Sequence, residues 1–329
     1  MRRVFLLSLL LVALSLLIPW LAVTLAPAGE EASPPAPSVP VSDTVAPDGA
    51  TPITALCGDA LIETTMADWL PGVVAAEMPA SFHTEALKAQ ACAARTYTVV
   101  RQASAHAAHP QADVCTDSGC CQAYVERQAA ETRWGISAGT YSAKISQAVA
   151  DTDGLGILYQ GAPIQAVFFS SAPGQTADAV AVWGSQVDYL KSVSSPERDE
   201  VPNYRSQVVL TAEEVRSRVL AAYPGADLSG DPSGWFGTPA SSGGAVTSIP
   251  VGGVTLTGGQ VRSLFSLRSA AFTVAWDGTS FTFSVTGYGH GVGMSQYGAN
   301  AMAKEGSSFR DILTWYYTGA QVDDLWAES

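Results

Sequence analysis

Two helical patterns meet at a Met-Pro pair between residues 69 and 99, and this junction constrains the fold more than any other feature of the chain. Apolar residues before the junction recur at helical spacing, and Pro71 lies where a first helical turn tolerates proline. A residue that precedes proline is pushed out of the α region, so the first helix is predicted to end at about Glu77. The sequence therefore predicts two helices joined by a turn, with the Glu77 carboxylate at that turn.

The surroundings of Glu77 predict a carboxyl group with a raised pKa. A carboxylate at the C-terminal end of a helix faces the negative end of the helix dipole, which disfavours ionisation. Ala75, Ala76 and Met78 offer little polar solvation, and both effects raise the pKa. A general acid that works near neutral pH needs such a shift. The alternative, judged from spacing alone, is an exposed carboxylate at a helix end.

The second helix is predicted to begin near Thr84, an N-cap residue, with Glu85 in the first turn. One stripe of this helix recurs at i, i+4, i+7 and i+11 and is predicted to be buried; it comprises Leu87, Ala91, Ala94 and Thr98. Lys88 and Arg95 are seven residues apart and share another face. That face is either a solvated surface or one wall of a site that includes Glu77.

The stretch 106–124 brings two histidines and three cysteines close together in sequence. His109, Cys115 and Cys121 are evenly spaced as H-x5-C-x5-C, and an imidazole with two thiolates suits Zn²⁺. Three protein ligands leave a fourth position for water or another group. A disulfide is the competing interpretation, and the adjacent Cys120 leaves its partner open.

A glycine-rich segment near the C-terminus forms a third notable pattern. Gly287, Gly289, Gly291 and Gly293 alternate around His290, which allows close backbone approach or unusual backbone dihedrals. A lone histidine is more often structural than catalytic. The Ser295 side chain is predicted to cap a helix that continues through Met302.

The rest of the chain predicts an α+β fold, with mixed helices and antiparallel strands around a substrate cleft. Strands are expected at 156–159, 164–169 and 190–193, and a loop at 225–248. Residues 211–222 predict a helix with a capping box formed by Thr211 and Glu214. A turn and helix are expected at 254–267 and a last helix after Ser307 or Ser308. Residues 272–276 and 280–286 predict a hairpin across Asp277-Gly278.

Composition limits the number of domains and the class of partner. The chain has 329 residues, a formal net charge of −13 and 47% hydrophobic residues, which suits one sizeable domain or two small ones plus an N-terminal segment. The acidic balance argues against nucleic acid, which attracts basic surfaces. It also argues against attachment to anionic lipid or wall polymers by charge alone.

The N-terminal segment has the composition of a membrane anchor. Arg2 and Arg3 precede an uncharged run at 4–26 that is long enough to cross a bilayer. The basic end is predicted to stay cytoplasmic and the rest of the chain to lie outside; cleavage at 26–28 is the alternative. We therefore divide the chain into an anchor or signal at 1–28, a Pro/Ala-rich linker at 29–52 and a folded domain at 53–329.

Two dense motifs carry a resemblance to a known family. The stretches GVVAAEMPASFHTEALKAQACAARTY and GYGHGVGMSQYGANAMAKEG closely resemble the stage II sporulation protein D family, also called the SpoIID/LytB domain. The resemblance implies that Glu77 is the catalytic residue of a peptidoglycan lytic transglycosylase and that Arg95 belongs to the same cleft. It also implies a structural zinc ion bound by His109, Cys115 and Cys121. Family members usually have a histidine before the second cysteine, where this chain has Cys120.

The resemblance extends to the residues expected to bind substrate. The segment VFFSSAPGQ aligns with a family segment written His-Ser-Thr-Ser-Gly-Gly, with Phe169 in place of the histidine. The serines of this segment either line the glycan groove or cap a turn. The full set expected to contact the glycan is Lys88, Arg95, Tyr97, Ser170, Ser171, His290, Ser295 and Gln296.

The implied activity is cleavage of glycan strands stripped of stem peptides, at the bond between N-acetylmuramic acid and N-acetylglucosamine, with a 1,6-anhydro product. The implied setting is engulfment during sporulation. The expected partners are a sporulation amidase of the stage II sporulation protein P type and a membrane complex. A noncatalytic wall-binding amidase enhancer is the first alternative, and a zinc hydrolase is the second.

Overall fold

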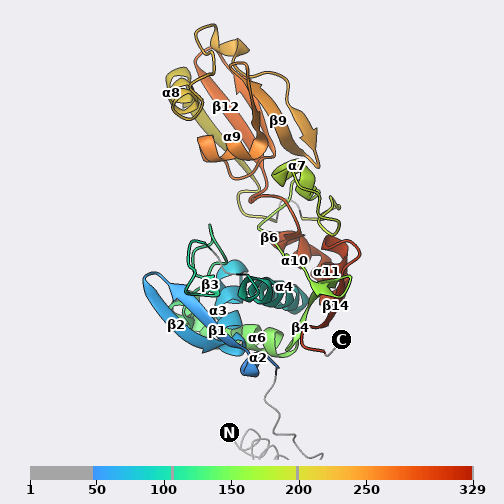
Figure 1. Ribbon diagram of the computed structural model, residues 1–329. Coiled ribbons are helices and arrows are strands. Elements are labelled where there is room, and N and C mark those ends of the chain that lie inside the picture. The colour runs from blue at the N-terminus through green and yellow to red at the C-terminus, as the bar shows by residue number, and fades with distance from the viewer. Residues whose placement is uncertain (1–46, 105–106, 198–199, 328–329) are drawn as a thin grey trace, which may run out of the picture. The chain divides into compact units, whose positions relative to one another are not determined.

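The computed structural model describes residues 47–104, 107–197 and 200–327 (Figure 1). The predicted anchor and residues 29–46 of the predicted linker lie outside the described residues. Among the residues that are described, no helix is both long enough and apolar enough to cross a membrane. The first elements are helix α2 (Pro47–Ala50) and strand β1 (Pro52–Cys57), so the fold includes residues before the predicted start at 53.

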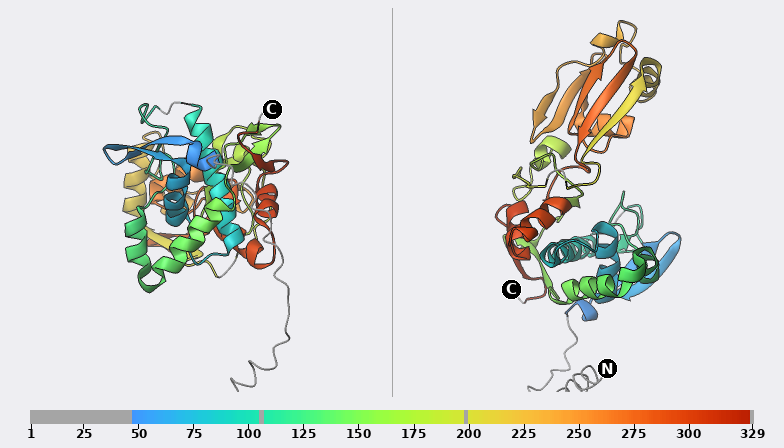
Figure 2. Two further views of the ribbon diagram at one scale, coloured as in Figure 1. Left: turned by 90° about the horizontal axis from the view of Figure 1, so that it is seen from below. Right: turned by 180° about the vertical axis from the view of Figure 1, so that it is seen from behind.

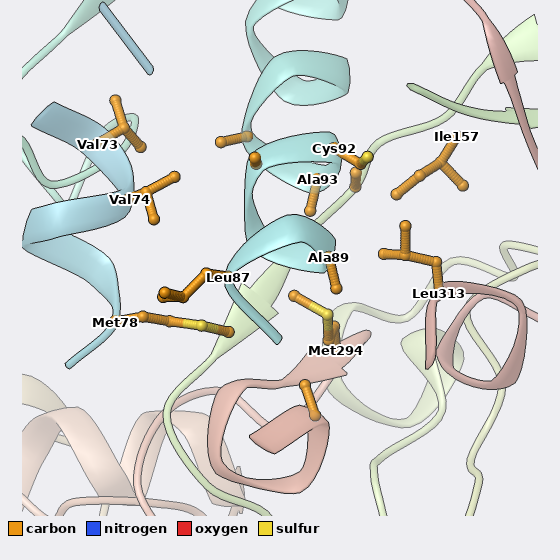
Figure 3. Close-up of a cluster of buried hydrophobic side chains, with 14 of the residues drawn as sticks. Val73, Val74, Met78, Leu87, Ala89, Cys92, Ala93, Ile157, Met294 and Leu313 are labelled. Atoms are coloured by element: carbon orange, nitrogen blue, oxygen red, sulfur yellow. The ribbon is translucent and has the colours of Figure 1, made fainter. Parts of the chain in front are cut away.

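A long helix, α4 (Thr84–Gln102), lies at the centre of the first hydrophobic core. It packs against α3 (Met66–Glu77), α6 (Ala138–Ala150), α10 (Gln296–Lys304), α11 (Phe309–Tyr316) and strand β4 (Leu155–Tyr159). Figure 3 shows apolar side chains of α3, α4 and α11 converging, with Met294 beside them. Alanines at 86, 89, 91, 93 and 94 are fully buried, and their small side chains let neighbouring elements approach α4 closely.

The predicted boundaries of the first two helices are confirmed, with one difference at the cap. Helix α3 ends at Glu77, and Met78 before the proline has extended backbone dihedrals. Helix α4 begins at Thr84, but its N-cap is His83, whose Nδ1 accepts the Glu85 backbone N–H. The predicted stripe of α4 is buried throughout.

Short strands surround the helices of the first core. Strand β1 pairs antiparallel with β2 (Ala60–Thr65) and parallel with β3 (Val114–Cys115). Strand β4 lies between β5 (Ala162–Pro163) and β14 (Gln321–Asp324), both antiparallel. Strand β6 (Phe168–Phe169) pairs parallel with β13 (Met294–Ser295). Helix α5 (Arg127–Trp134) and the 3₁₀ turn η1 (Gly135–Ser137) lead into α6.

A second hydrophobic core is built from strands and two helices (orange and yellow in the right-hand view of Figure 2). One sheet has the order β11 (Phe272–Trp276), β12 (Ser280–Thr286), β7 (Arg205–Thr211). The other has the order β10 (Val254–Thr257), β9 (Ala245–Val251), β8 (Ala240–Ser242). Helices α8 (Ala212–Ala222) and α9 (Gly258–Phe265) contribute to the core, and the 3₁₀ turn η2 (Pro232–Gly234) precedes β8.

Most sequence predictions for this second region are confirmed. The two hairpin strands have the predicted bounds, although three residues join them, with Gly278 at a φ of +95°. The capping box of Thr211 and Glu214 is present. The predicted loop at 225–248 was wrong in part, because it contains β8 and the start of β9.

The segment 164–193 differs most from its prediction. Only two residues of the expected strand at 164–169 are paired, as β6, and 190–193 forms no strand. Residues Ala179–Trp183 form a short helix, α7, that was not predicted. The apolar residues of the segment 164–193 alternate because they pack into the first hydrophobic core, and not because they belong to a sheet. The mixture of helices and antiparallel sheets is confirmed as the fold class, with two short parallel pairings in addition.

Candidate active site and metal centre

The Glu77 carboxylate is half-buried at the C-terminal end of α3. Its Oε1 accepts the backbone N–H of Ala123 at 2.7 Å. Its Oε2 accepts the side-chain amide of Gln296 at 3.4 Å. No ion pair formed within the described residues includes Glu77. The carboxylate is thus held by two neutral donors and no cation.

These surroundings raise the pKa of Glu77, as the sequence predicts. Burial is the main cause, because it disfavours the charged form. The hydrogen bonds from Ala123 and Gln296 stabilise the carboxylate and lower the pKa in part. The carboxyl group therefore keeps its proton at pH values where an exposed glutamate would be ionised. A general acid needs this property.

Gln296 connects Glu77 to helix α4. It is the first residue of α10, and its Nε2 also lies 3.3 Å from Oε1 of Gln90. Gln90 is fully buried, and its own Nε2 has no hydrogen-bond partner in the described part of the chain. Gln90 was not among the predicted site residues. Its signal in the sequence is a lone amide within a run of buried alanines.

The start of α10 is fixed by a buried carboxylate, that of Glu197. The Ser295 side chain caps the helix by accepting the Gly298 N–H at 3.2 Å, as predicted. Its hydroxyl also donates to Oε1 of Glu197, which accepts the Ala172 N–H at 2.5 Å. Glu197 is 1% exposed. Sequence analysis missed Glu197 because nothing near it in the chain marks it as buried.

Ser170 and Ser171 lie between the start of α10 and the glycine-rich segment. The carbonyl of Ser170 accepts the Tyr297 N–H at 3.0 Å. Ser171 exchanges backbone hydrogen bonds with Tyr288, at 3.0 and 2.8 Å. The Ser171 hydroxyl is buried without a hydrogen-bond partner among the residues described. Ser170 thus contacts the residue that follows Gln296, and Ser171 contacts the glycine-rich segment.

His290 is held by the backbone at both ring nitrogens. Its Nδ1 accepts the Val292 N–H at 3.2 Å, so Nε2 carries the proton and donates to the Phe168 carbonyl at 3.0 Å. Burial lowers the pKa of His290 to about 4, which keeps the ring neutral. The predicted close backbone approach is also present, since a Cβ on Gly293 would lie 2.1 Å from the Val167 carbonyl oxygen.

Arg95 lies in a buried ion pair rather than beside Glu77. Its side chain is 0% exposed and binds the Asp48 carboxylate through Nε at 2.7 Å and Nη2 at 2.7 Å. Nη1 donates to the Leu155 carbonyl at 2.8 Å. The guanidinium therefore joins α2, α4 and β4. This position does not support a direct contact between Arg95 and the glycan.

Lys88 is also engaged in ion pairs away from Glu77. Its Nζ lies 3.2 Å from a Glu85 oxygen and 2.9 Å from an Asp151 oxygen. The hydrogen bond to Asp151 is the main reason that the pKa of Lys88 is raised. The structure thus separates the predicted residues. Gln296 contacts Glu77, and Ser170 and Ser295 lie next to the start of α10. Ser171 contacts the glycine-rich segment, and Lys88 and Arg95 brace the helices.

The predicted metal ligands come together in the segment between α4 and α5, which includes β3. Donor atoms of His109, Cys115, Cys120 and Cys121 all lie within 4.8 Å of one another. His109 is buried, and its Nδ1 lies 3.0 Å from the Ala112 carbonyl. That contact leaves Nε2, 3.2 Å from the Cys121 sulfur, to face the cluster. The cluster can hold a metal ion.

The donor set differs from the prediction by one residue. Cys120 adds a fourth donor atom to the cluster, and none of the five cysteines forms a disulfide. Three thiolates and one imidazole match a closed, four-coordinate zinc site of the structural kind. Tyr97 faces this loop, because its hydroxyl lies 3.4 Å from the Cys120 carbonyl. Burial raises the pKa of Tyr97 to about 12.

The loop that carries the His/Cys cluster reaches Glu77 directly. Ala123, the backbone donor to Glu77, follows Cys121 by two residues. A cavity of about 630 Å³ lies elsewhere and is lined by α2, α3, α5, α6 and residues 124–127, without Glu77. Two segments hold the Glu77 carboxylate: the loop through Ala123 and the start of α10 through Gln296.

Comparison with known proteins assigns the family. A sequence profile described as stage II sporulation protein matches residues 59–159. Stage II sporulation protein D of Bacillus subtilis (strain 168) is 41% identical over 258 residues, which is 78% of this chain and 74% of the relative. The protein of the same name from Bacillus amyloliquefaciens is 37% identical over the same shares. This chain belongs to the stage II sporulation protein D family.

A more distant relative carries a different name. The amidase enhancer of Bacillus subtilis (strain 168) is 27% identical over 304 residues, which cover 77% of this chain and 40% of that protein. This chain is therefore also similar to a protein named as an enhancer of an amidase.

Proposed function

We propose that the chain is a lytic transglycosylase that cleaves denuded peptidoglycan glycan strands during sporulation. The observation that carries the proposal is the half-buried Glu77 carboxyl, which has a raised pKa and no ion-pair partner in the described residues. A single group of this kind can serve as acid and then as base, whereas glycosidases that use water generally need two carboxylates.

In the proposed reaction, Glu77 first protonates the glycosidic oxygen between N-acetylmuramic acid and N-acetylglucosamine. The bond from C1 to that oxygen breaks, and its electron pair leaves with the N-acetylglucosamine hydroxyl. The Glu77 carboxylate then takes the proton of the muramic C6 hydroxyl as that oxygen attacks C1. The new O6–C1 bond closes the 1,6-anhydro ring, and Glu77 is protonated again.

Neighbouring groups support each half of this cycle. The Ala123 N–H and the Gln296 amide stabilise the carboxylate once it has given up its proton. Burial favours the return of the proton. The two effects oppose each other, which keeps the free energies of the two protonation states close enough for one group to perform both transfers.

Zinc is the metal that the four donors fit best. Bound there, it would brace the loop that carries Ala123. The loop's own residues perform the local task, because His109, Cys115, Cys120 and Cys121 fix the chain just before the backbone N–H that donates to Glu77. We also propose that residues 1–28 anchor the protein with its catalytic domain outside the cytoplasm, where an amidase of the sporulation protein P type would supply denuded strands.

Product analysis tests the proposal. Wild type incubated with denuded glycan strands is expected to release fragments with 1,6-anhydromuramic ends, detected by mass spectrometry. Glu77→Gln, which is nearly isosteric but cannot titrate, is expected to lower the rate by about 10²- to 10⁴-fold. Gln296→Asn is a matched amide-shortening variant that keeps the acid and should retain measurable turnover. Absence of anhydro ends from wild type would overturn the proposal.

The second candidate is a noncatalytic amidase enhancer, favoured by the relative of that name. Its test uses the same protein with an amidase and intact wall sacculi. Stimulation of the amidase that is equal in wild type and Glu77→Gln, together with no anhydro product, would establish this second function instead.

A further inference from the structure

Two arginines near the glycine-rich segment lack a partner of opposite charge. Arg262 lies in α9 and Arg268 follows that helix, and both side chains are half-buried. Neither takes part in any ion pair formed within the described residues, although the chain has 30 acidic residues against 17 basic ones. The Arg268 Nε is buried and donates no hydrogen bond there. A buried guanidinium nitrogen without an acceptor is costly, and a ligand that supplied the missing acceptor would remove this cost.

Arg268 stacks on Tyr288, and Arg262 lies near the same tyrosine. The Arg268 Cζ lies 4.1 Å from the centroid of the Tyr288 ring. Burial lowers the pKa of Arg262, and the nearby Tyr288 opposes that effect. The Gly289 N–H donates to the Arg268 carbonyl at 3.0 Å, which fixes Arg268 beside the tyrosine. A guanidinium stacked on a ring keeps its N–H edge free for a planar anion.

A short run of backbone contacts connects this pair to Glu77. Tyr288 exchanges hydrogen bonds with Ser171, and the neighbouring Ser170 accepts the Tyr297 N–H. Tyr297 follows Gln296, the residue that contacts the Glu77 carboxylate. The charge of Arg268 also lowers the pKa of Tyr297, against the larger raising effect of burial. The serine segment thus has the arginines on one side and the catalytic acid on the other.

A carboxylate is the anion that this arrangement fits. Arginine binds planar carboxylates through two parallel N–H···O bonds, and Tyr288, which is 44% exposed, leaves the approach open. A glycan strand stripped of stem peptides bears a free lactyl carboxylate on each muramic residue. On a strand that keeps its peptides, the same group is a neutral amide.

We propose that Arg268, stacked on Tyr288, binds the free lactyl carboxylate of N-acetylmuramic acid with Arg262 nearby, and so selects denuded glycan. The inference rests on the proposed transglycosylase function and names the feature of the substrate that is read. It places the enzyme after a reaction that hydrolyses the amide between the lactyl group and the stem peptide, because only that reaction exposes the carboxylate.

Binding to two matched glycans tests the subsite. The full chain with Glu77→Gln is used so that no strand is cleaved. One glycan is denuded; the other is the same preparation with its lactyl carboxylates converted to methylamides by carbodiimide coupling. Amidation is expected to weaken binding about tenfold or more, the effect of losing one charged contact. Free N-acetylmuramic acid is expected to compete, and inorganic phosphate at the same concentration is not.

Variants of the arginines provide the second arm. In the Glu77→Gln background, Arg262→Gln and Arg268→Gln are expected to bind both glycans equally, at the weaker level. Arg268→Lys keeps the charge and the fold but loses the two-pronged donor, and is expected to lose part of the preference. The matched control is Arg218→Gln, on α8, which should keep the full preference.

The outcomes separate this inference from the proposed function. Equal binding of the two glycans by the Glu77→Gln protein would overturn the carboxylate subsite while wild type still released anhydro products. Competition by phosphate but not by muramic acid would also overturn it, in favour of a phosphate-bearing wall polymer. No binding to either glycan and no anhydro product would overturn both proposals.

Discussion

Glu77 and Arg95 belong to the same sequence signature, yet the structure gives them opposite surroundings. Arg95 is fully buried and binds one carboxylate and two carbonyls, so that each of its three guanidinium nitrogens donates a hydrogen bond. Glu77 is half-buried and has two neutral donors, one of them at 3.4 Å. A charge that is fully paired within the fold stabilises it, whereas a charge that is incompletely paired beside solvent remains available for proton transfer.

Arg95 and Glu77 are therefore expected to matter for different reasons, Arg95 for the stability of the fold and Glu77 for the proposed reaction. Replacing Arg95 leaves the buried Asp48 without its cation, so the effect falls on the folded state. Replacing Glu77 removes a group whose ionisation the fold disfavours, so the effect falls on the reaction. Stability and turnover should therefore separate cleanly between the two positions.

The largest expected effect is the loss of the buried ion pair. Arg95→Met should lower the free energy of unfolding by about 3–5 kcal/mol, because Asp48 is left buried and uncompensated. Urea unfolding followed by circular dichroism measures this change. The control is Arg127→Gln, which breaks the exposed pair with Glu131 and should cost less than about 1 kcal/mol. If Arg95→Met were fully stable but failed to bind glycan, Arg95 would regain its predicted role in the cleft.

Metal removal should come next in size. A chelator, or Cys121→Ser, is expected to loosen the loop and weaken the hydrogen bond from Ala123 to Glu77. A hydrogen bond to a charged group contributes about 1.5–3 kcal/mol, so turnover should fall about 10- to 100-fold. Anhydro-product rates and hydrogen exchange of the Ala123 amide give the two readouts. Cys57→Ser, outside the cluster, should change neither.

The fourth ligand can be tested in the same way. Cys120→Ser should lower the zinc content measured by mass spectrometry of the native protein, because the cluster would keep only three of its four donors. Full retention of zinc in Cys120→Ser would restore the three-ligand set predicted from sequence.

A smaller effect is expected from Gln296. Its amide lowers the pKa of Glu77, so Gln296→Leu should raise that pKa further. The acid must be protonated to act, and activity is lost as pH rises through its pKa. The alkaline limb of the pH–rate profile should therefore move to higher pH, with turnover reduced about 2- to 10-fold. A limb that stays in place or moves to lower pH would show that another group titrates.

The smallest effect concerns stability at Glu77 itself. Because its pKa is raised in the fold, ionisation costs stability progressively as pH rises above the unfolded pKa, and the full cost is reached above the raised pKa. Glu77→Gln removes this cost and should stabilise the protein at neutral pH by at most about 1 kcal/mol. The gain should vanish below about pH 4, the range of an unperturbed glutamate, where both states are protonated. Thermal unfolding at pH 7 and pH 4 measures the difference, and a loss of stability at pH 7 would contradict it.

Much of the local structure follows from short-range signals. The proline after Met78 ends α3 at Glu77, and side-chain caps begin α8, α10 and α11 where the sequence predicts. The buried stripe of α4 follows from the helical period. These signals act over a few residues, so they can be recognised in the sequence without knowledge of the fold. The middle segment 164–193 lacked them and was the least accurate part of the prediction.

The sequence alone indicated the family, Glu77 as the candidate acid and three of the four residues of the His/Cys cluster, because those residues lie in dense local motifs. Only the tertiary structure decided their partners. Asp48 meets Arg95 across 47 residues, Ala123 meets Glu77 across 46, and Gln296 meets Glu77 across 219. Contacts of that separation depend on how helices pack, and packing reflects the whole buried surface rather than any one pattern. A motif can therefore name a charged residue, while the fold determines whether its charge is neutralised within the protein or left for a substrate.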